Sequence, residues 1–123
     1  MSLIEIHGRL GYTALFYTVI MAVWGLWRFF RRKGLDSSYW GAGVVAEVLY
    51  LIQGALGAFL FLSGTGNLSG RTIHILYGVV AVLVAPAIFF FTRGEDSRRP
   101  MLVYGVGFLF LAGIILRGIT TAG

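Results

Sequence analysis

The sequence contains no cysteine among its 123 residues. This absence excludes disulfides, cysteine-ligated iron–sulfur clusters and the covalent attachment of a c-type haem. Any cofactor must therefore be held by other side chains.

Charged residues are also scarce, at 12% of the chain, whereas 58% of the residues are apolar and the mean hydropathy is +0.84. These values lie far from those of a soluble domain. A hydrocarbon core about 30 Å thick requires about 20 apolar residues per helix, which leaves room for four spans. Since no basic leader or small-residue cleavage site precedes the first apolar run, we expect that run to be a membrane helix and not a signal peptide.

Four apolar runs are separated by charged or glycine-rich breaks. We expect helices over about 9–29, 39–62, 72–92 and 101–119, forming one all-α domain over residues 1–123. The predicted fold is an integral membrane four-helix bundle with up-down topology. Proline is rare, and Pro86 is expected to kink the third helix because it frees the carbonyl of Val82. Pro100 lies where a proline suits a helix start.

Basic residues indicate how the chain is oriented. Seven of the ten flank the first and third connections: Arg28, Arg31, Arg32, Lys33, Arg93, Arg98 and Arg99. The excess of positive charge predicts that these connections are cytoplasmic and that both termini lie outside, on the periplasmic side of a plasma or inner membrane. The net charge of +5 is thus assigned to membrane boundaries and not to nucleic-acid binding. The aromatic residues Trp24, Trp27, Tyr39 and Trp40 are expected to form an interfacial belt at the cytoplasmic boundary.

The first and third predicted helices share an internal repeat. His7, Gly11, Ala14 and Thr18 have the same spacing as His74, Gly78, Ala81 and Ala85. Steps of four, three and four place each set on one helix face. Because the two helices run parallel and lie diagonally in an up-down bundle, both histidines are expected near the outer end, facing a shared interior.

The repeat favours a haem site. We predict that His7 and His74 ligate one haem iron from opposite sides, with Gly11 and Gly78 making room for the porphyrin. The propionates would pair with the arginines near the same end, which are Arg9, Arg71 and Arg117. The alternative is that the small residues only allow close helix packing, that the histidines are interfacial and that the arginines bind lipid headgroups.

With these motifs, the chain resembles the diagonal bis-histidine haem bundles of membrane b-type cytochromes and, more distantly, haem A synthase. The resemblance rests on His7, His74 and their glycines, and it implies one haem b and electron transfer. Those families commonly carry two histidine pairs, whereas this chain has one. A single haem near the outer face does not bridge a core about 30 Å thick, so electrons are expected to pass to partner membrane subunits or to a quinone.

Two polar residues lie within the second predicted helix. Glu47 is the only acid inside a span, and it is either a proton carrier beside a quinone or substrate, or a hydrogen-bonded tie to a neighbouring helix. It shares a helix face with Tyr50, Gly54, Gly57 and Phe61. Gln53 is expected to form an interhelical hydrogen bond or to touch a cofactor edge.

The sequence therefore favours a small cytochrome b-like subunit of a respiratory or photosynthetic complex, which relays electrons and leaves substrate chemistry to its partners. One alternative is an accessory subunit that has no cofactor or that binds a pigment. Another is a small proton-coupled exporter that uses Glu47, although the small multidrug transporters carry their glutamate in the first helix.

Overall fold

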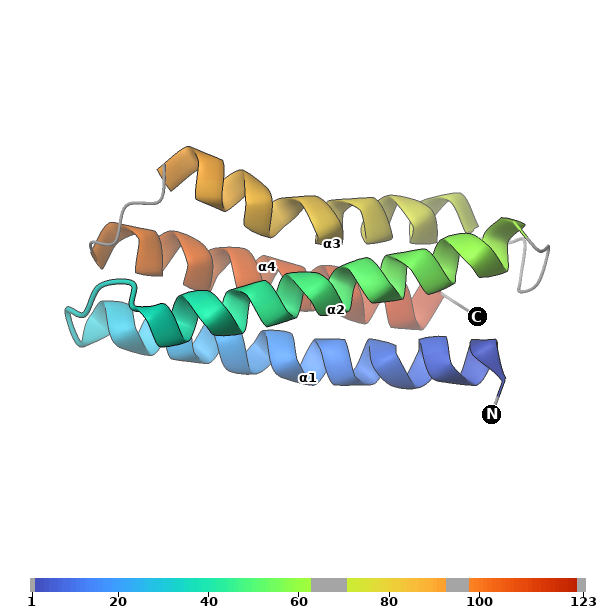
Figure 1. The fold of residues 1–123 in the computed structure, drawn as a ribbon, viewed down its shortest axis with the longest axis horizontal. Helices are drawn as coiled ribbons and strands as arrows, with labels where there is room; N and C mark the ends of the chain where they lie inside the picture. The colour runs from blue at the N-terminus through green and yellow to red at the C-terminus, as the bar shows by residue number, and fades with distance from the viewer. Residues whose placement is uncertain (1, 63–70, 93–97, 122–123) are drawn as a thin grey trace.

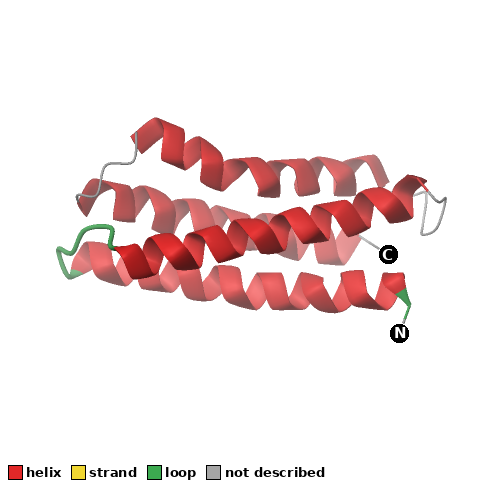
Figure 2. Ribbon diagram, in the orientation of Figure 1, coloured by secondary structure: helices red, strands yellow, loops and turns green. Residues whose placement is uncertain are grey.

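The computed structural model describes residues 2–62, 71–92 and 98–121 of the chain, and for Arg71, Thr72, Ile73 and Thr121 the backbone alone. Within these ranges the chain forms α1 (Leu3–Phe30), α2 (Ser37–Leu62), α3 (Arg71–Thr92) and α4 (Arg98–Thr121). All four are long and apolar enough to cross a membrane, and helix accounts for nearly all of the described chain (Figure 2). The predicted all-α membrane bundle is confirmed.

Three helices begin earlier than predicted, and polar residues cap two of them. The hydroxyl of Ser2 accepts a hydrogen bond from the Glu5 backbone N–H at 3.2 Å, the arrangement of a Ser-x-x-Glu capping box. Helix α1 therefore starts at Leu3 instead of residue 9, and His7 lies within its second turn. At α2, the Asp36 carboxylate accepts from the backbone N–H of Tyr39 at 2.8 Å. Helix α4 starts at Arg98, which places Pro100 in the first turn, where a proline costs no hydrogen bond.

The helices alternate in direction and follow one another around the bundle (Figure 1). Helix α1 packs against α2 and α4, and α3 packs against the same two helices, so α1 and α3 occupy diagonal positions. The connection from Arg31 to Asp36 lies at one end, which we call the basic end. The N-terminus and both histidines lie at the other, which we call the histidine end.

The half of the bundle nearest the basic end is tightly packed. Five of its large apolar side chains are at most 1% exposed, and they are Met21, Tyr39, Met101, Phe108 and Leu111. Backbones meet here as well, because a Cβ added to Gly105 would lie 2.9 Å from the backbone nitrogen of Leu26. Glycine at this position therefore allows α1 and α4 to approach closely.

Tyr39 departs from the predicted interfacial belt. It is 1% exposed, and its hydroxyl donates a hydrogen bond to the carbonyl of Met21 at 2.9 Å. Trp27 and Trp40, by contrast, are 53% and 42% exposed, which suits an interface. Tyr39 reaches the core because it occupies the inward face of the first turn of α2, where its hydroxyl finds a partner on α1.

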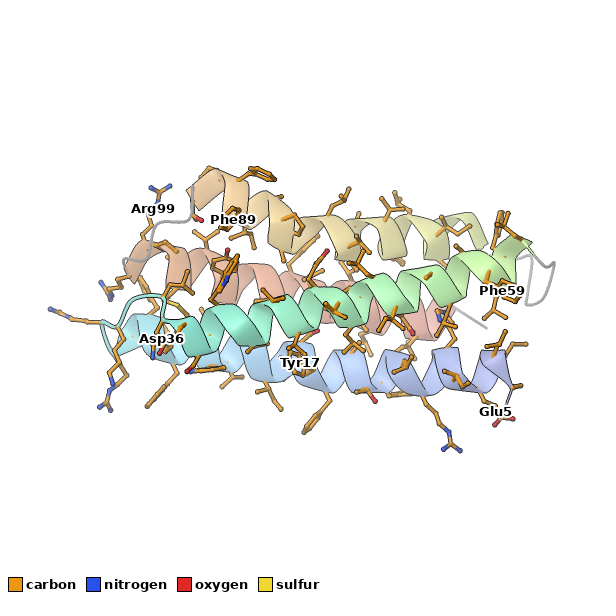
Figure 3. All side chains as sticks on the ribbon, in the orientation of Figure 1. Glu5, Tyr17, Asp36, Phe59, Phe89 and Arg99 are labelled. Atoms are coloured by element: carbon orange, nitrogen blue, oxygen red, sulfur yellow. The ribbon has the colours of Figure 1, made fainter. Side chains whose placement is uncertain are left out.

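Outside the core, the helices present apolar side chains to their surroundings (Figure 3). Phe16, Phe90 and Leu62 are 71%, 75% and 83% exposed. An exterior of this kind is costly in water and favourable in hydrocarbon. The protein is accordingly a multi-pass membrane protein whose outer surface contacts lipid.

Candidate functional site

The structure brings the chain's two histidines together at one end of the bundle. His7 comes from α1 and His74 from the diagonal helix α3, and their ring centroids are 5.9 Å apart with the ring planes at 79°. Both side chains are partly buried. The repeat thus places the two imidazoles close together across the bundle interior, with their ring planes nearly perpendicular.

A backbone carbonyl orients the ring of His74. Its Nδ1 lies 3.1 Å from the carbonyl oxygen of Gly118 in α4. Because a carbonyl can only accept, Nδ1 donates in this hydrogen bond, and in the neutral ring Nε2 then keeps its lone pair. Histidines that ligate metals commonly have this support from their second nitrogen.

Gln53 of α2 lies beside His7. Its amide nitrogen donates to the backbone carbonyl of His7 at 2.7 Å, so the predicted interhelical hydrogen bond is confirmed. Gln53 also interacts with the His7 side chain. In the described part of the chain, however, neither the His7 Nδ1 nor the Gln53 Oε1 has a partner that meets hydrogen-bond geometry, although both atoms are buried. The two atoms are chemically complementary, because Nδ1 can donate and Oε1 can only accept.

A cavity of about 800 Å³ adjoins the two histidines and is lined by residues of all four helices. This volume falls within the range of about 300–1,000 Å³ that is typical of small-molecule and cofactor sites. The wall is largely apolar, and the small residues lining it are Gly8, Gly11, Ala14, Gly54, Ala55, Gly57, Ala58, Gly78, Ala81 and Gly118. The cavity can therefore bury a large apolar ligand next to two nitrogen ligands.

The glycines of the repeat have different surroundings. A Cβ on Gly78 would meet no atom within 4 Å, whereas one on Gly11 would lie 3.3 Å from the Gln53 amide nitrogen. Gly78 thus leaves open space beside His74, and Gly11 makes room for the side chain that contacts His7. Neither supports a close contact between helix backbones, the alternative that the sequence left open.

Further along the repeat, the two helices differ. Thr18 is fully buried, and its hydroxyl is hydrogen-bonded to that of Tyr50 at 2.5 Å. Ala85 lines a second pocket instead of the histidine cavity. The matching positions therefore share a role only in the half of the bundle that contains the histidines.

The three predicted propionate partners lie near the histidine end, but they do not all have a described side chain. Arg9 and Arg117 are exposed and are not among the residues that line the cavity. Arg71 is the first residue of α3, and its side chain lies outside the described structure. Pairing of these arginines with an anionic group stays a prediction.

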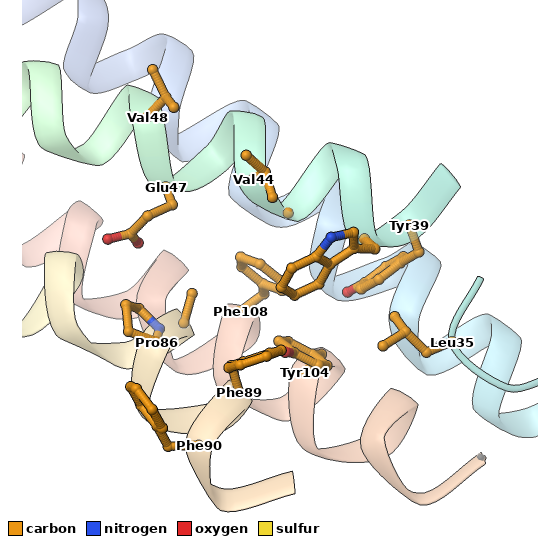
Figure 4. Close-up of a pocket in the computed structure, with 13 residues that line it drawn as sticks. Leu35, Tyr39, Val44, Glu47, Val48, Pro86, Phe89, Phe90, Tyr104 and Phe108 are labelled. Atoms are coloured by element: carbon orange, nitrogen blue, oxygen red, sulfur yellow. The ribbon is translucent and has the colours of Figure 1, made fainter. Parts of the chain in front are cut away.

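Glu47 does not face the histidine cavity. It lines a separate pocket of about 250 Å³ in the half nearer the basic end, where Figure 4 shows its carboxylate beside Pro86. The residues predicted to share its helix face, Tyr50, Gly54, Gly57 and Phe61, line the histidine cavity instead. Glu47 and the histidines therefore belong to two sites.

Sequence reasoning did not assign two glycines, Gly57 of α2 and Gly118 of α4, to the histidines. A Cβ on Gly57 would lie 3.3 Å from Cε1 of His7, and one on Gly118 would lie 3.8 Å from Nδ1 of His74. Both glycines make room for an imidazole. The four-residue spacing of Gln53 and Gly57 on one helix face was the available signal, but it could not show which helix they face.

No group of three or more His, Cys, Asp or Glu side chains that could hold a metal ion occurs in the described ranges. Two histidines alone suit a metal whose remaining ligands come from a cofactor ring. Comparison with protein families, characterised proteins and solved structures found no match to this chain. The resemblance to membrane b-type cytochromes therefore stays a prediction.

Proposed function

We propose that this protein binds one haem b between His7 and His74 and serves as an electron-transfer subunit in a membrane complex. The observation that carries the proposal is the separation of 5.9 Å between the two imidazole centroids. An imidazole nitrogen binds a transition metal at about 2 Å, so two rings on opposite sides of one metal have centroids roughly 6 Å apart. The spacing would allow His7 and His74 to hold one metal between them.

The surrounding residues suit this ligand. The Gly118 carbonyl directs Nε2 of His74 away from α4 and leaves it available for iron. The apolar cavity wall would remove a macrocycle from water, and burial of apolar surface contributes roughly 25 cal/mol per Å². Haem held by two neutral imidazoles supplies one-electron transfer. The protein would hold the macrocycle, exclude water from it and keep one nitrogen of each histidine unprotonated for the iron.

The position of the site bears on its partners. By the positive-inside rule, the excess of basic residues at the other end favours a histidine end that faces the periplasm of a plasma or inner membrane. The propionates would then emerge near Arg9, Arg71 and Arg117. One haem at this end leaves most of a core about 30 Å thick uncrossed. Electrons would therefore be exchanged with partner membrane subunits or a quinone, since the short connections give little surface for soluble donors.

A reduced-minus-oxidised visible spectrum of the purified protein tests the proposal. We expect a low-spin b-type spectrum with one haem per chain, lost in both His7→Ala and His74→Ala. The exposed Lys33→Ala variant, measured beside them, should keep the spectrum, because Lys33 lies at the basic end and does not line the cavity. A wild-type protein that takes up no haem during expression or reconstitution would contradict the proposal and favour an accessory subunit. If the ligand were a pigment held by one histidine, pigment binding would be retained in one of the two variants.

A further inference from the structure

A second pocket lies between α2, α3 and α4, in the half of the bundle nearer the basic end (Figure 4). Its volume is about 250 Å³, close to the lower limit of about 300 Å³ for small-molecule sites. Pro86 of α3 lines it, and this proline removes one backbone hydrogen bond from its helix. Phe90 and Trp40, 75% and 42% exposed, also line it. The pocket therefore communicates with the lipid side of the bundle.

Two polar atoms in this pocket lack partners among the described residues. They are Oε1 of Glu47 and the hydroxyl of Tyr104, and both are buried. Tyr104 is only 5% exposed. The neighbouring Thr92 hydroxyl interacts with that of Tyr104, but the two do not meet hydrogen-bond geometry, and Thr92 donates to the carbonyls of Ile88 and Phe89. Leaving such groups unpaired costs roughly 1–3 kcal/mol each, so a ligand that satisfies them is favoured.

The lining determines what that ligand can be. Among the described residues, the lining contains no Arg, Lys or His, so an anion would find no counter-charge there. Without a cation among these lining residues, a charged Glu47 is costly in an apolar surrounding, and the neutral carboxylic acid is the cheaper form. A neutral acid and a phenol both offer a hydrogen-bond donor. The complementary ligand therefore carries acceptor oxygens.

The walls favour a flat ring. Aromatic side chains dominate them, and Trp40 and Phe89 have centroids 5.2 Å apart with planes tilted by 37°. Tyr104 and Phe108 are stacked at 6.3 Å. Aromatic faces of this kind bind a planar group by offset or edge contacts.

We infer that this pocket binds the headgroup of a neutral, lipid-soluble molecule whose ring carries carbonyl oxygens, the chemistry of a quinone. Tyr104 and the Glu47 acid donate hydrogen bonds to the carbonyls, and an apolar tail extends into lipid past Phe90. Glu47 and Tyr50 are three residues apart on α2, about 4.5 Å along the helix axis, and Tyr50 lines the histidine cavity. The ligand site is thus one helical turn from the histidine cavity. Only its role as an electron partner rests on the proposed function, and binding does not.

Photolabelling tests the site. The probe is a benzoquinone with a decyl tail and a photoreactive azide, applied to the full chain in lipid nanodiscs, with mass spectrometry to locate the label. We expect saturable labelling of peptides containing Trp40 or Phe89, displaced by unlabelled decyl-benzoquinone. Tyr104→Phe should weaken the affinity about three- to ten-fold, the effect of one hydrogen bond, whereas Tyr12→Phe should not.

A matched pair of variants on α3 guards against misfolding. Ala85 lines the pocket and Ala87 is exposed, so Ala85→Leu should abolish labelling and Ala87→Leu should leave it unchanged. Any of three results would overturn the inference. They are labelling that does not saturate, labelling that persists in Ala85→Leu, and labelling that is displaced only by the lipophilic cation tetraphenylphosphonium and not by the neutral quinone. The haem spectrum of the same samples separates the two proposals, because loss of haem with labelling retained contradicts only the proposed function.

Discussion

The two ends of the bundle use glycine in opposite ways. At the basic end, Gly105 brings backbones together, since an added Cβ would lie 2.9 Å from the Leu26 nitrogen. At the histidine end, Gly78 faces open space, and Gly57 makes room for the ring of His7. Small residues at helical spacing therefore indicate either packing or a cavity, and only the neighbouring helix decides which.

The same contrast separates stability from function. A tightly packed half, centred on Tyr39 and Phe108, can hold the helices in register while the other half stays hollow around the histidines. An unfilled cavity lowers the free energy of unfolding because packing contacts are missing. A bound ligand would raise it again by stabilising the folded state. We therefore expect substitutions at the histidine end to change ligand binding and those at the basic end to change folding.

The largest effect is expected from Gly78→Leu. The new side chain would project into the cavity beside His74, where nothing lies within 4 Å of a Cβ, and we expect complete loss of haem with the fold retained. Gly113→Leu is the matched control, since its Cβ also meets no atom but Gly113 does not line the cavity. Haem per chain and helical circular dichroism measure both effects. Equal haem content in the two variants would contradict the assignment of the cavity.

Gln53→Leu should lower haem affinity about 10- to 100-fold, the usual effect of losing a group that orients a metal ligand. Gln53→Glu retains an acceptor oxygen for Nδ1 of His7 but loses the amide N–H that donates to the His7 carbonyl. It should restore only part of the affinity while shifting the haem midpoint potential to lower values, because a carboxylate makes the imidazole a stronger donor. Haem titration and redox potentiometry measure the two quantities. A purely structural Gln53 would change affinity without this shift in potential.

Gly105→Ala should destabilise the cofactor-free protein by about 2 kcal/mol, within the usual cost of overpacking. The reason is that the methyl group would collide with the backbone of α1. Gly78→Ala, by contrast, should leave the free energy of unfolding unchanged or raise it slightly, since alanine favours helix over glycine. Unfolding in sodium dodecyl sulfate, followed by circular dichroism, compares them. If both variants lose the same stability, the two ends do not differ as described.

Tyr39→Phe should cost about 1 kcal/mol, the typical net value of a buried hydrogen bond. It removes only the hydroxyl that donates to the Met21 carbonyl. Tyr12→Phe makes the same change at a side chain that is 63% exposed and should stay within about 0.5 kcal/mol of the wild type. The same denaturant titration measures both, and a neutral Tyr39→Phe would show that this bond does not hold α2 against α1.

The fold was predictable because hydropathy and span length leave few choices for a chain of this size in a membrane. Helix starts were placed less well, since Ser2 and Asp36 act through local hydrogen bonds that a hydropathy pattern does not contain. The pairing of His7 with His74 followed from the repeat, because equal spacing places both histidines at the same level of the bundle and on matching helix faces. Tyr39 was misplaced because aromatic residues near a span end suit either the interface or the core.

The rest of the site depends on interhelical register. Gly118 forms a hydrogen bond with His74, and Gln53 forms one with His7. Each bond joins two helices, and no sequence pattern links the two residues of either pair. The second pocket depends on how α3 lies beside α2 near Pro86. Neither arrangement follows from residue spacing within one helix.

The most direct test of a shared axial pair is imidazole rescue of His74→Gly. This variant removes the ring and leaves a space that free imidazole can fill. We expect the purified variant to lack the low-spin b-type spectrum, and millimolar imidazole with added haem to restore it; His7→Gly should behave alike. A wild-type-like spectrum in either variant without imidazole, or no recovery in both although the helical signal is intact, would contradict the account.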